Sequence, residues 1–301
     1  MIPTFPSFKN LEWEDHCFIR NFTNSYLPFS DYNFVSMWSW NTSQRMRVSQ
    51  LYGNLVILFY DYVSEKPFLS FLGTDKISET INELLDYSMA FFQFELLKLI
   101  PEVVVKTIDR SEFNVLEDAD SHDYILSVDY LMALDKLPRS GNYSGYWCQK
   151  FLKLYPNTKT KIDSLQNVDK AEVKGTFIHW SNSRQCNHWE LNEFRAFDRF
   201  IDNHEIDNEI VSIYDSSTLI GFVTIEKVSE EFAITHFAKA DVSYKGIYSA
   251  LLWEVGKVLS EKKIRYLNFE QDLGIPGLRY SKKKFKPSFY LKKFIIERKS
   301  K

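Results

Sequence analysis

Cysteine, glycine and proline are all scarce in this chain of 301 residues, which has 3 Cys, 10 Gly and 9 Pro. Cys17, Cys148 and Cys186 lie far apart and are odd in number, and they form no CxxC pair and no Cys/His spacing typical of zinc ligands. We therefore expect neither a disulfide framework nor a metal site, and reduced thiols predict a cytoplasmic protein. So few glycines and prolines argue against a fibrous or disordered chain.

Long apolar runs and a strong net charge are missing as well. No stretch approaches the roughly 18 apolar residues that a membrane-spanning helix needs. The residues from Met1 to Pro6 include no basic segment and no apolar segment, so the sequence predicts no signal peptide. The formal net charge of −3 gives no overall preference for nucleic acid. Because the sequence predicts no membrane-spanning helix, the protein would meet any lipid at a membrane surface.

Aromatic residues, in contrast, are plentiful, with 25 Phe, 17 Tyr and 7 Trp. Each buried ring removes a large apolar area from water, so the chain can form a sizeable core. Its length fits two domains of about 150 residues each.

The same order of predicted elements occurs twice along the chain. Three strand patterns, then a helix, then another strand occupy 46–51, 54–60, 67–72, 76–90 and 95–100. The order returns at 209–214, 219–227, 232–240, 247–261 and 266–269. This order is typical of an acyltransferase-type α/β half, so we predict two related domains, 1–165 and 166–301, divided within the polar 156–175 segment.

Other patterns predict elements outside this repeat. Helices are expected at 11–20, 34–40, 101–107, 143–154 and 187–203, a strand pair at 113–117 and 123–128, and a last strand at 290–297.

The segment from Asn268 to Pro287 has the densest set of chemical groups. Glu270 and Asp272 follow a strand, and Arg279 and Lys282 follow a glycine turn at 274–277. A carboxylate and a guanidinium seven residues apart across a turn can fold back on one another. Asp272 would then be a base or orienter for an amine, while Arg279 and Lys282, with Glu270 beside them, hold an anionic substrate. The alternative is a structural ion pair that braces the turn.

A basic stretch continues from this segment to the C-terminus. The segment from Arg279 to Lys301 contains ten basic residues and one acidic residue, Glu297. Such a stretch either docks phosphate groups or is a solvated strand and tail.

Two further candidates precede the helix at 247–261. Gly246 stands where the Arg/Gln-x-x-Gly-x-Gly/Ala loop of Gcn5-type N-acetyltransferases holds the pyrophosphate of coenzyme A, although Ser243 and Tyr248 depart from that pattern. A glycine that only begins the helix is the alternative. Strand alternation places His236 on one face and Lys239 on the other. In a functional reading, His236 is a general base and Lys239 is an anion anchor. In a structural reading, His236 is a hydrogen-bonded histidine of the strand and Lys239 is a half-buried lysine.

Several motifs, taken in order, resemble one family. They are Ser30-Asp31-Tyr32-Asn33-Phe34 with Trp40, Glu117 to Tyr124, Phe151 to Pro156, His236 to Ala240, Lys245 to Tyr248 and Asn268 to Pro287. Together they resemble the domain of unknown function 2156 family, which is related to the C-terminal catalytic domain of phosphatidylglycerol lysyltransferase. The resemblance covers nearly the whole chain.

This resemblance implies an α/β fold of two tandem GNAT-like (acyl-CoA N-acyltransferase-type) domains with mixed, mostly antiparallel sheets and flanking helices. It implies transfer of an activated acyl group, from an aminoacyl-tRNA or acyl-coenzyme A donor, to an amine or a lipid head group, with no further cofactor. The cationic stretch from Arg279 to Lys286 would suit the acceptor end of a tRNA or a phospholipid head group.

One departure from the family pattern favours a different function. Family members usually have a basic Lys-Arg-Asn stretch where this chain has Tyr146-Trp147-Cys148-Gln149-Lys150. The alternative is therefore a degenerate, non-catalytic GNAT-like fold that binds an anionic ligand.

Overall fold

The computed structural model describes residues 1–61, 64–138, 140, 143–183 and 188–299, with only the backbone at 188–191. Cys186, the predicted helix start at Asn187 and the terminal Lys301 lie outside the described residues. The chain forms two compact units, one of Met1–Asp123 with Leu291–Lys301 and the other of Tyr124–Tyr290.

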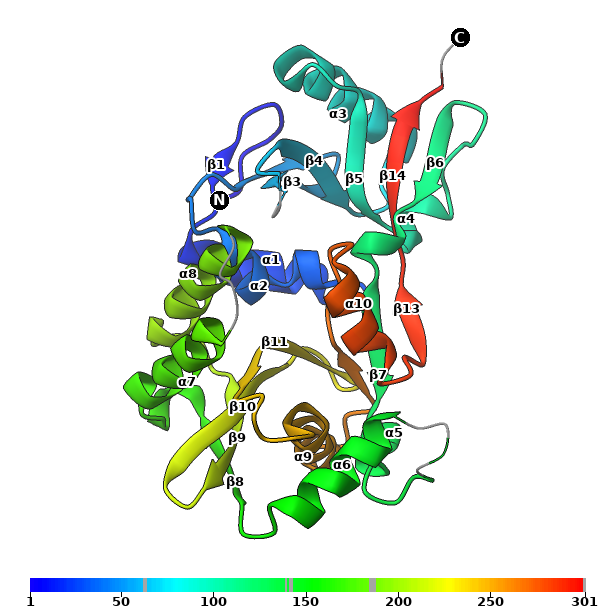
Figure 1. The fold of residues 1–301 in the computed structure, drawn as a ribbon. Helices are drawn as coiled ribbons and strands as arrows, with labels where there is room; N and C mark the ends of the chain where they lie inside the picture. The colour runs from blue at the N-terminus through cyan, green and yellow to red at the C-terminus, as the bar shows by residue number, and fades with distance from the viewer. Residues whose placement is uncertain (62–63, 139, 141–142, 184–187, 300–301) are drawn as a thin grey trace. The chain divides into compact units, whose positions relative to one another are not determined.

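The first unit is built on a seven-stranded sheet in the order β1-β2-β3-β4-β5-β14-β6. Its strands are β1 (Lys9–Asn10), β2 (Arg47–Leu51), β3 (Asn54–Tyr60), β4 (Pro67–Leu72), β5 (Leu96–Pro101), β6 (Phe113–Glu117) and β14 (Lys293–Arg298), and its helices are α1 (His16–Thr23), α2 (Phe34–Trp40), α3 (Ile77–Phe92) and α4 (Glu102–Val105). Helix α3 lies against this sheet (Figure 1). Its buried face, which includes Ile81 and Leu84, packs with Leu69 and Leu97 of the sheet.

The second unit is built on another seven-stranded sheet, in the order β13-β7-β12-β11-β10-β9-β8. Its strands are β7 (Asp123–Ser127), β8 (Lys159–Ser164), β9 (Glu209–Asp215), β10 (Thr218–Lys227), β11 (Phe232–Ala240), β12 (Tyr266–Asn268) and β13 (Phe289–Leu291). Its helices are α5 (Val128–Met132), α6 (Tyr143–Leu154), α7 (Lys170–Asn182), α8 (His188–Asp202), α9 (Ile247–Glu261) and α10 (Pro276–Lys283).

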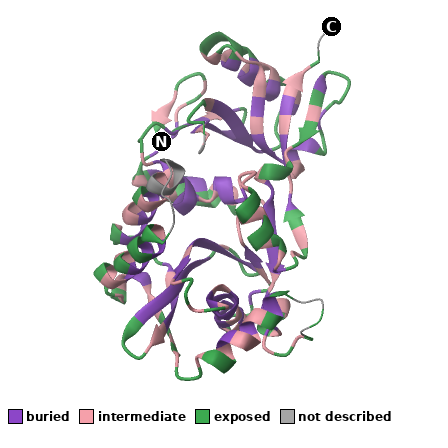
Figure 2. Cartoon of the chain, viewed as in Figure 1, coloured by how far each residue is buried: buried purple, intermediate pink, exposed green. Residues whose placement is uncertain are grey.

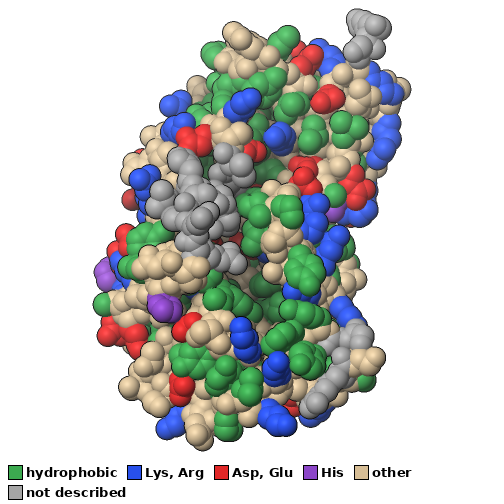
Figure 3. Space-filling view, viewed as in Figure 1, with side chains coloured by type: hydrophobic (Ala, Val, Ile, Leu, Met, Phe, Trp, Pro, Cys, Tyr) green, Lys and Arg blue, Asp and Glu red, His purple; other side chains and the backbone are tan. Residues whose placement is uncertain are grey.

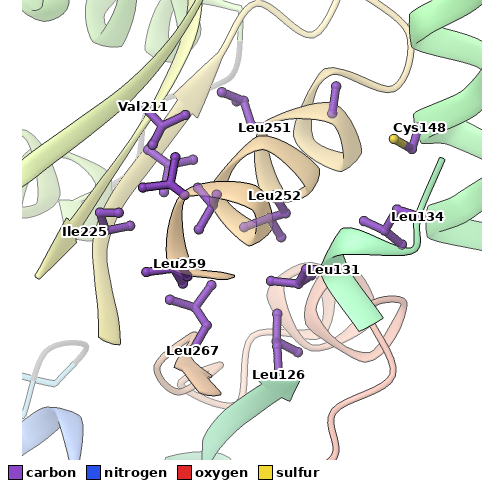
Figure 4. Close-up of a cluster of buried hydrophobic side chains, with 14 of the residues drawn as sticks. Leu126, Leu131, Leu134, Cys148, Val211, Ile225, Leu251, Leu252, Leu259 and Leu267 are labelled. Carbon is purple, nitrogen blue, oxygen red and sulfur yellow. The ribbon is translucent and has the colours of Figure 1, made fainter. Parts of the chain in front are cut away.

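Helix α9 forms the centre of the second unit's core. Its apolar residues recur every three or four positions, so Leu252 and Leu259 reach the same side of the helix. They lie among Leu126 of β7, Leu131 of α5 and Leu267 of β12 (Figure 4). Buried residues follow the strands and α9 through this unit, and exposed residues lie on the outer helices and loops (Figure 2).

The repeated order of elements predicted from the sequence is present in both units. The antiparallel strands β2, β3 and β4 precede α3 and then β5, which lies parallel to β4. Likewise β9, β10 and β11 precede α9 and then β12, which lies parallel to β11. The predicted α/β class, with two mixed and mostly antiparallel sheets and flanking helices, is confirmed.

Two predicted strand assignments are wrong. The strands at 113–117 and 123–128 do not pair with each other, because β6 pairs with β14 in the first sheet and β7 with β12 in the second. The predicted strand at 290–297 is two strands, β13 and β14, which belong to different sheets. In each case the chain passes from one unit to the other between the two strands, and no local pattern marks that passage.

The structure also divides the chain at a different place from the predicted boundary within 156–175. The segment from Tyr124 onward belongs to the second unit because Leu126, Leu131 and Phe151 pack in the core around α9. The predicted boundary segment itself forms β8 and the start of α7, and Val173 and Phe177 of α7 are buried.

Candidate functional site

Asp272 accepts hydrogen bonds from three different parts of the second unit. Arg279 donates to both carboxylate oxygens, from Nε to Oδ2 and from Nη2 to Oδ1, each at 2.8 Å. The Gly274 amide donates to Oδ1 at 2.9 Å, and the Tyr124 hydroxyl donates to Oδ2. The Asp272 side chain has no exposed surface, whereas 34% of the Arg279 side chain is exposed. The predicted pairing of Asp272 with Arg279 is therefore present as a bidentate contact.

The turn that holds Asp272 has an unusual backbone. Glu270 and Leu273 have φ angles of 55° and 56°, and Gly274 follows with a φ of 70°. A left-handed conformation is costly for residues with a Cβ, so local contacts must hold it. The buried Asn268 side chain accepts from the Glu270 amide at 2.7 Å, and the Glu270 carbonyl accepts from the Tyr124 amide. Pro276 then begins α10, where its missing N–H costs nothing.

These hydrogen bonds decide the charge of Asp272. Burial alone would raise the pKa of its carboxyl, but the donors Arg279, Tyr124 and Gly274 together hold that pKa below its ordinary value. A carboxylate that is ionised and fully engaged is a poor proton acceptor. Of the two predicted roles, this geometry favours the orienter over the base.

Tyr124 is a partner of Asp272 that was not predicted from the sequence. Burial and the contact with Asp272 raise the pKa of its hydroxyl, so Tyr124 stays protonated and remains a donor. Its ring also meets the Tyr290 ring edge-on, with 5.0 Å between centroids. The only sequence signal was its place at the end of the Glu117–Tyr124 motif, 148 residues from Asp272.

Lys282 lies on the same helix as Arg279 but faces the end of β12. Its ammonium donates to the Phe269 carbonyl and lies 4.6 Å from the centroid of the Phe269 ring. The structure thus brings Glu270, Asp272, Arg279 and Lys282 together in one turn and one helix.

His236 is held by a pair of buried contacts on another part of the sheet. Its Nε2 lies 3.0 Å from Oε2 of Glu226, and its ring packs against that of Phe200 on α8. The predicted alternation is wrong here, because a β-bulge sets both His236 and Phe237 opposite Thr224. The extra residue turns His236 away from Ala238 and Ala240, which pack in the core with α9.

Lys239 contacts the two helices on that same side of the sheet. Its ammonium donates to Glu193 of α8 at 2.7 Å and lies 3.7 Å from the centroid of the Trp180 ring on α7. His236 and Lys239 thus support α7 and α8, on elements other than those that hold Asp272.

Gly246 begins α9 with a φ of 93°, which only glycine adopts easily. A Cβ at this position would lie 2.2 Å from the Trp147 carbonyl oxygen and 3.2 Å from the Phe151 Cβ. The Tyr155 hydroxyl also accepts from the Lys245 amide at 3.2 Å. Helix α6 therefore covers this loop closely, which explains the glycine through packing.

A second buried polar cluster lies in the first unit. The Lys293 ammonium contacts Asp123 at 2.7 Å, Ser30 at 3.3 Å and also Asp31. The Ser30 amide donates to Asp123 at 2.8 Å, and the Lys293 amide donates to His122. Burial would lower the pKa of Lys293, but Asp123 and Asp31 outweigh it and raise that pKa. The motif that contains Ser30 and Asp31 thus contacts the motif that ends at Tyr124. Lys293 is a core residue, although it lies in the basic stretch.

Neither a metal nor a membrane span is indicated in the part of the chain that the structure describes. Those residues include no group of three His, Cys, Asp or Glu side chains placed to bind a metal ion. They also form no helix with the length and apolar character needed to cross a bilayer.

The fold is that of a two-unit α/β protein, and its second unit holds the Arg279 guanidinium against the buried Asp272 carboxylate. Residues 148–297 match the family described as phosphatidylglycerol lysyltransferase, C-terminal. The resemblance to this family that the motifs predicted is therefore confirmed.

Solved structures agree on the fold. A conserved protein of unknown function from Bacteroides thetaiotaomicron matches with a TM-score of 0.81 at 22% identity, over 99% of this chain and 100% of that one. The DUF2156 C-terminal domain of a proposed lysylphosphatidylglycerol synthetase from Agrobacterium fabrum gives a TM-score of 0.63 at 10% identity, with coverages of 95% and 92%. L-PGS from Bacillus licheniformis gives 0.60 at 13% identity, with coverages of 97% and 94%.

Among curated proteins, an uncharacterised protein of Mycoplasmoides gallisepticum is 22% identical over 196 residues, which are 62% of this chain. The chain spans 60% of the length of that relative.

Proposed function

We propose that this protein is a transferase that moves an activated acyl or aminoacyl group to an amine or a lipid head group. The family match over residues 148–297 supports the class of reaction. The observation that carries the proposal is Arg279, whose guanidinium is fixed by a buried carboxylate while a third of its side chain stays exposed. A fixed, always-charged guanidinium is suited to bind a phosphate or carboxylate of a substrate.

The roles of the site residues follow from their contacts. An aminoacyl ester or a thioester is already activated, so transfer depends on positioning and on stabilising the developing oxyanion. Arg279 is the anion anchor, Asp272 and Tyr124 orient it, and Lys282 and Glu270 set the position of α10 and its turn. His236 and Lys239 are supporting groups that hold α7 and α8 against the sheet.

Of the two donor types, an aminoacyl-tRNA fits the proposal better than coenzyme A. A pyrophosphate at the start of α9 needs an open backbone loop. At Gly246 the Trp147 carbonyl already occupies the space where a Cβ would project, and Tyr155 engages the neighbouring amide.

A non-catalytic, anion-binding protein is the second candidate, and one observation favours it. Asp272 accepts hydrogen bonds from Arg279, Tyr124 and Gly274, which hold the pKa of its carboxyl below the ordinary value and make it a poor base.

Thermal-shift and transfer assays separate the two functions. A ligand that binds the folded state raises the melting temperature by mass action, so we expect a shift with an aminoacyl-tRNA or a phospholipid head group. A transferase also forms product, and Arg279→Ala lowers both the shift and the product. A shift without any product supports the binding protein, and no shift with either ligand or with coenzyme A thioesters contradicts both functions.

A further inference from the structure

Aromatic rings and lysines alternate across the outer sides of α6 and α10. The Lys284 ammonium lies 3.5 Å from the centroid of the Tyr280 ring and 3.9 Å from that of Tyr143. Tyr143 contacts Trp147, with 5.9 Å between centroids, and Trp147 contacts Tyr146 at 5.3 Å. The Lys150 ammonium lies 4.6 Å from the centroid of the Trp147 ring. We call these residues the α6–α10 surface: Tyr143, Tyr146, Trp147, Lys150, Tyr280 and Lys284.

This surface is exposed although its rings are large. Tyr280 is 62% exposed, Tyr143 47% and Tyr146 37%. Residues three and four apart share one side of a helix, so the exposed side of α6 continues through Lys150 to Leu154, which is 49% exposed. The opposite side of α6, with Cys148 and Phe151, is buried in the core. Helix α6 is therefore anchored by one side and presents a second, amphipathic side to solvent.

Cys148 does not make this a reactive site. Burial raises the pKa of its thiol to about 12, so it remains a protonated core residue. The function of the surface must come from its rings and charges.

The two segments that carry the rings have charges of a single sign. Neither α6 nor the segment from Pro276 to Lys286 contains an acidic residue. The basic residues of these two segments are Lys150, Lys153, Arg279, Lys282, Lys283, Lys284 and Lys286. On the face shown in Figure 3, hydrophobic side chains and those of Lys and Arg are intermingled over the second unit. A surface of this kind is complementary to an anionic partner that also accepts apolar groups.

We infer that the α6–α10 surface binds the head-group layer of an anionic lipid bilayer. Tyr and Trp rings are enriched at that depth of a membrane, where one side of the ring is apolar and the other is wet. Lysines lie along such rings and keep their ammonium groups among the head groups, where anionic lipids attract them. This binding goes beyond the transfer reaction and does not depend on it.

Single-stranded RNA fits the surface less well. RNA-binding platforms stack bases on open ring faces. Here Lys284 lies over the rings of Tyr143 and Tyr280, and Lys150 lies over that of Trp147. The exposed aliphatic chain of Leu154 also has no role in base stacking, whereas it suits a lipid interface.

Co-sedimentation of the full chain with vesicles tests this inference. We expect binding to phosphatidylcholine vesicles that contain phosphatidylglycerol, weaker binding to phosphatidylcholine alone, and weakening by salt. Lys150→Gln and Lys284→Gln should each lower the binding constant for the anionic vesicles about fivefold. Tyr143→Ser with Tyr280→Ser should weaken binding to both kinds of vesicle. Phe91→Ser is the control, because Phe91 is 66% exposed but belongs to α3 of the first unit.

Three results would overturn the inference, provided that the melting temperatures of the variants match the wild type. These are no preference for anionic vesicles at low salt, unchanged vesicle binding by the variants, and loss of RNA binding by the variants while vesicle binding persists. The transfer reaction is scored separately with a water-soluble acceptor and no vesicles. Tyr143→Ser keeps wild-type turnover there, so a failed transfer assay and a failed vesicle assay are distinguishable.

Discussion

Arg279 contacts both carboxylate oxygens of Asp272, with Nε and Nη2 each 2.8 Å from its acceptor. The contact joins α10 to the turn that follows β12, and Tyr124 adds β7 through its hydroxyl. One buried carboxylate therefore fixes three elements and also sets the direction of an exposed guanidinium. Stability and ligand binding are expected to depend on the same pair.

Replacing Arg279 by Ala should destabilise the protein. The change leaves Asp272 buried with two fewer donors, and a buried acceptor that loses its donors costs about 1–3 kcal/mol. Urea unfolding followed by tryptophan fluorescence measures the loss. Arg265→Ala is the matched control, since the Arg265–Glu231 pair is mostly exposed and should contribute much less to stability. Equal losses of unfolding free energy in the two variants would show that the buried Asp272 contact contributes no more to stability than an exposed ion pair.

Acid stability should depend on Tyr124. Because the folded-state pKa of Asp272 lies below its ordinary value of 3.8, its contribution is fully present above that value and is lost as pH falls through the folded-state pKa. Tyr124→Phe removes one donor, raises that pKa and moves acid unfolding to a higher pH. Circular dichroism across an acid titration shows the shift. Tyr52→Phe, at an exposed tyrosine of the first unit, should leave the acid midpoint unchanged.

Lys293 should support the first unit up to alkaline pH. Lys293→Met leaves Asp31 and Asp123 buried without their cation and should cost about 3–5 kcal/mol. Since the folded-state pKa of Lys293 is raised, the wild-type contribution is present below the ordinary value of 10.5 and is lost as pH rises through the folded-state pKa.

Denaturant unfolding of Lys293→Met at neutral pH and above pH 10 tests this expectation. Lys262→Met, in a half-exposed pair with Glu209, is the control and should change stability by less than about 1 kcal/mol. A difference between wild type and Lys293→Met that stays constant through alkaline pH would contradict the proposed titration.

Gly246→Ala and Gly175→Ala should change stability in opposite directions. A Cβ at Gly246 would lie 2.2 Å from the Trp147 carbonyl oxygen on a left-handed backbone, so alanine should cost about 2–4 kcal/mol. Gly175 is inside α7, where an added Cβ would have nothing within 4 Å, and alanine there should add about 0.5–1 kcal/mol. Thermal melts of the two variants compare them directly. An unchanged melting temperature in Gly246→Ala would contradict this expectation, since it would show that α6 can move away from the added Cβ at little cost.

Local patterns predicted most of the elements but not their partners. The hairpin of β2 and β3 and the amphipathic α9 were evident because their apolar residues follow periods of two and of three to four. Helix α7 was missed because it begins in a polar, charged segment, although its Val173 and Phe177 are buried. Strand β7 joins the sheet of the second unit and β14 joins that of the first. Both placements depend on contacts between residues far apart in the chain, which a local hydrophobic period cannot predict.

The same limit applies to the site. Asp272 and Arg279 were found because they are seven residues apart across a turn. Tyr124 and the Lys293 cluster were not found as sites, because their partners come from the far ends of the sequence. The bulge at His236 reversed a face assignment, since one extra residue in a strand shifts the alternation.

The most direct test of the proposed transferase measures product from labelled aminoacyl-tRNAs and acyl-coenzyme A thioesters with phosphatidylglycerol or a small amine as acceptor. We predict product from at least one combination. We also predict at least a roughly tenfold lower kcat/KM in Arg279→Lys, which keeps the charge but loses the bidentate contact, while Arg265→Lys matches the wild type. Absence of product in every combination, or equal rates in both variants, would contradict the proposed function.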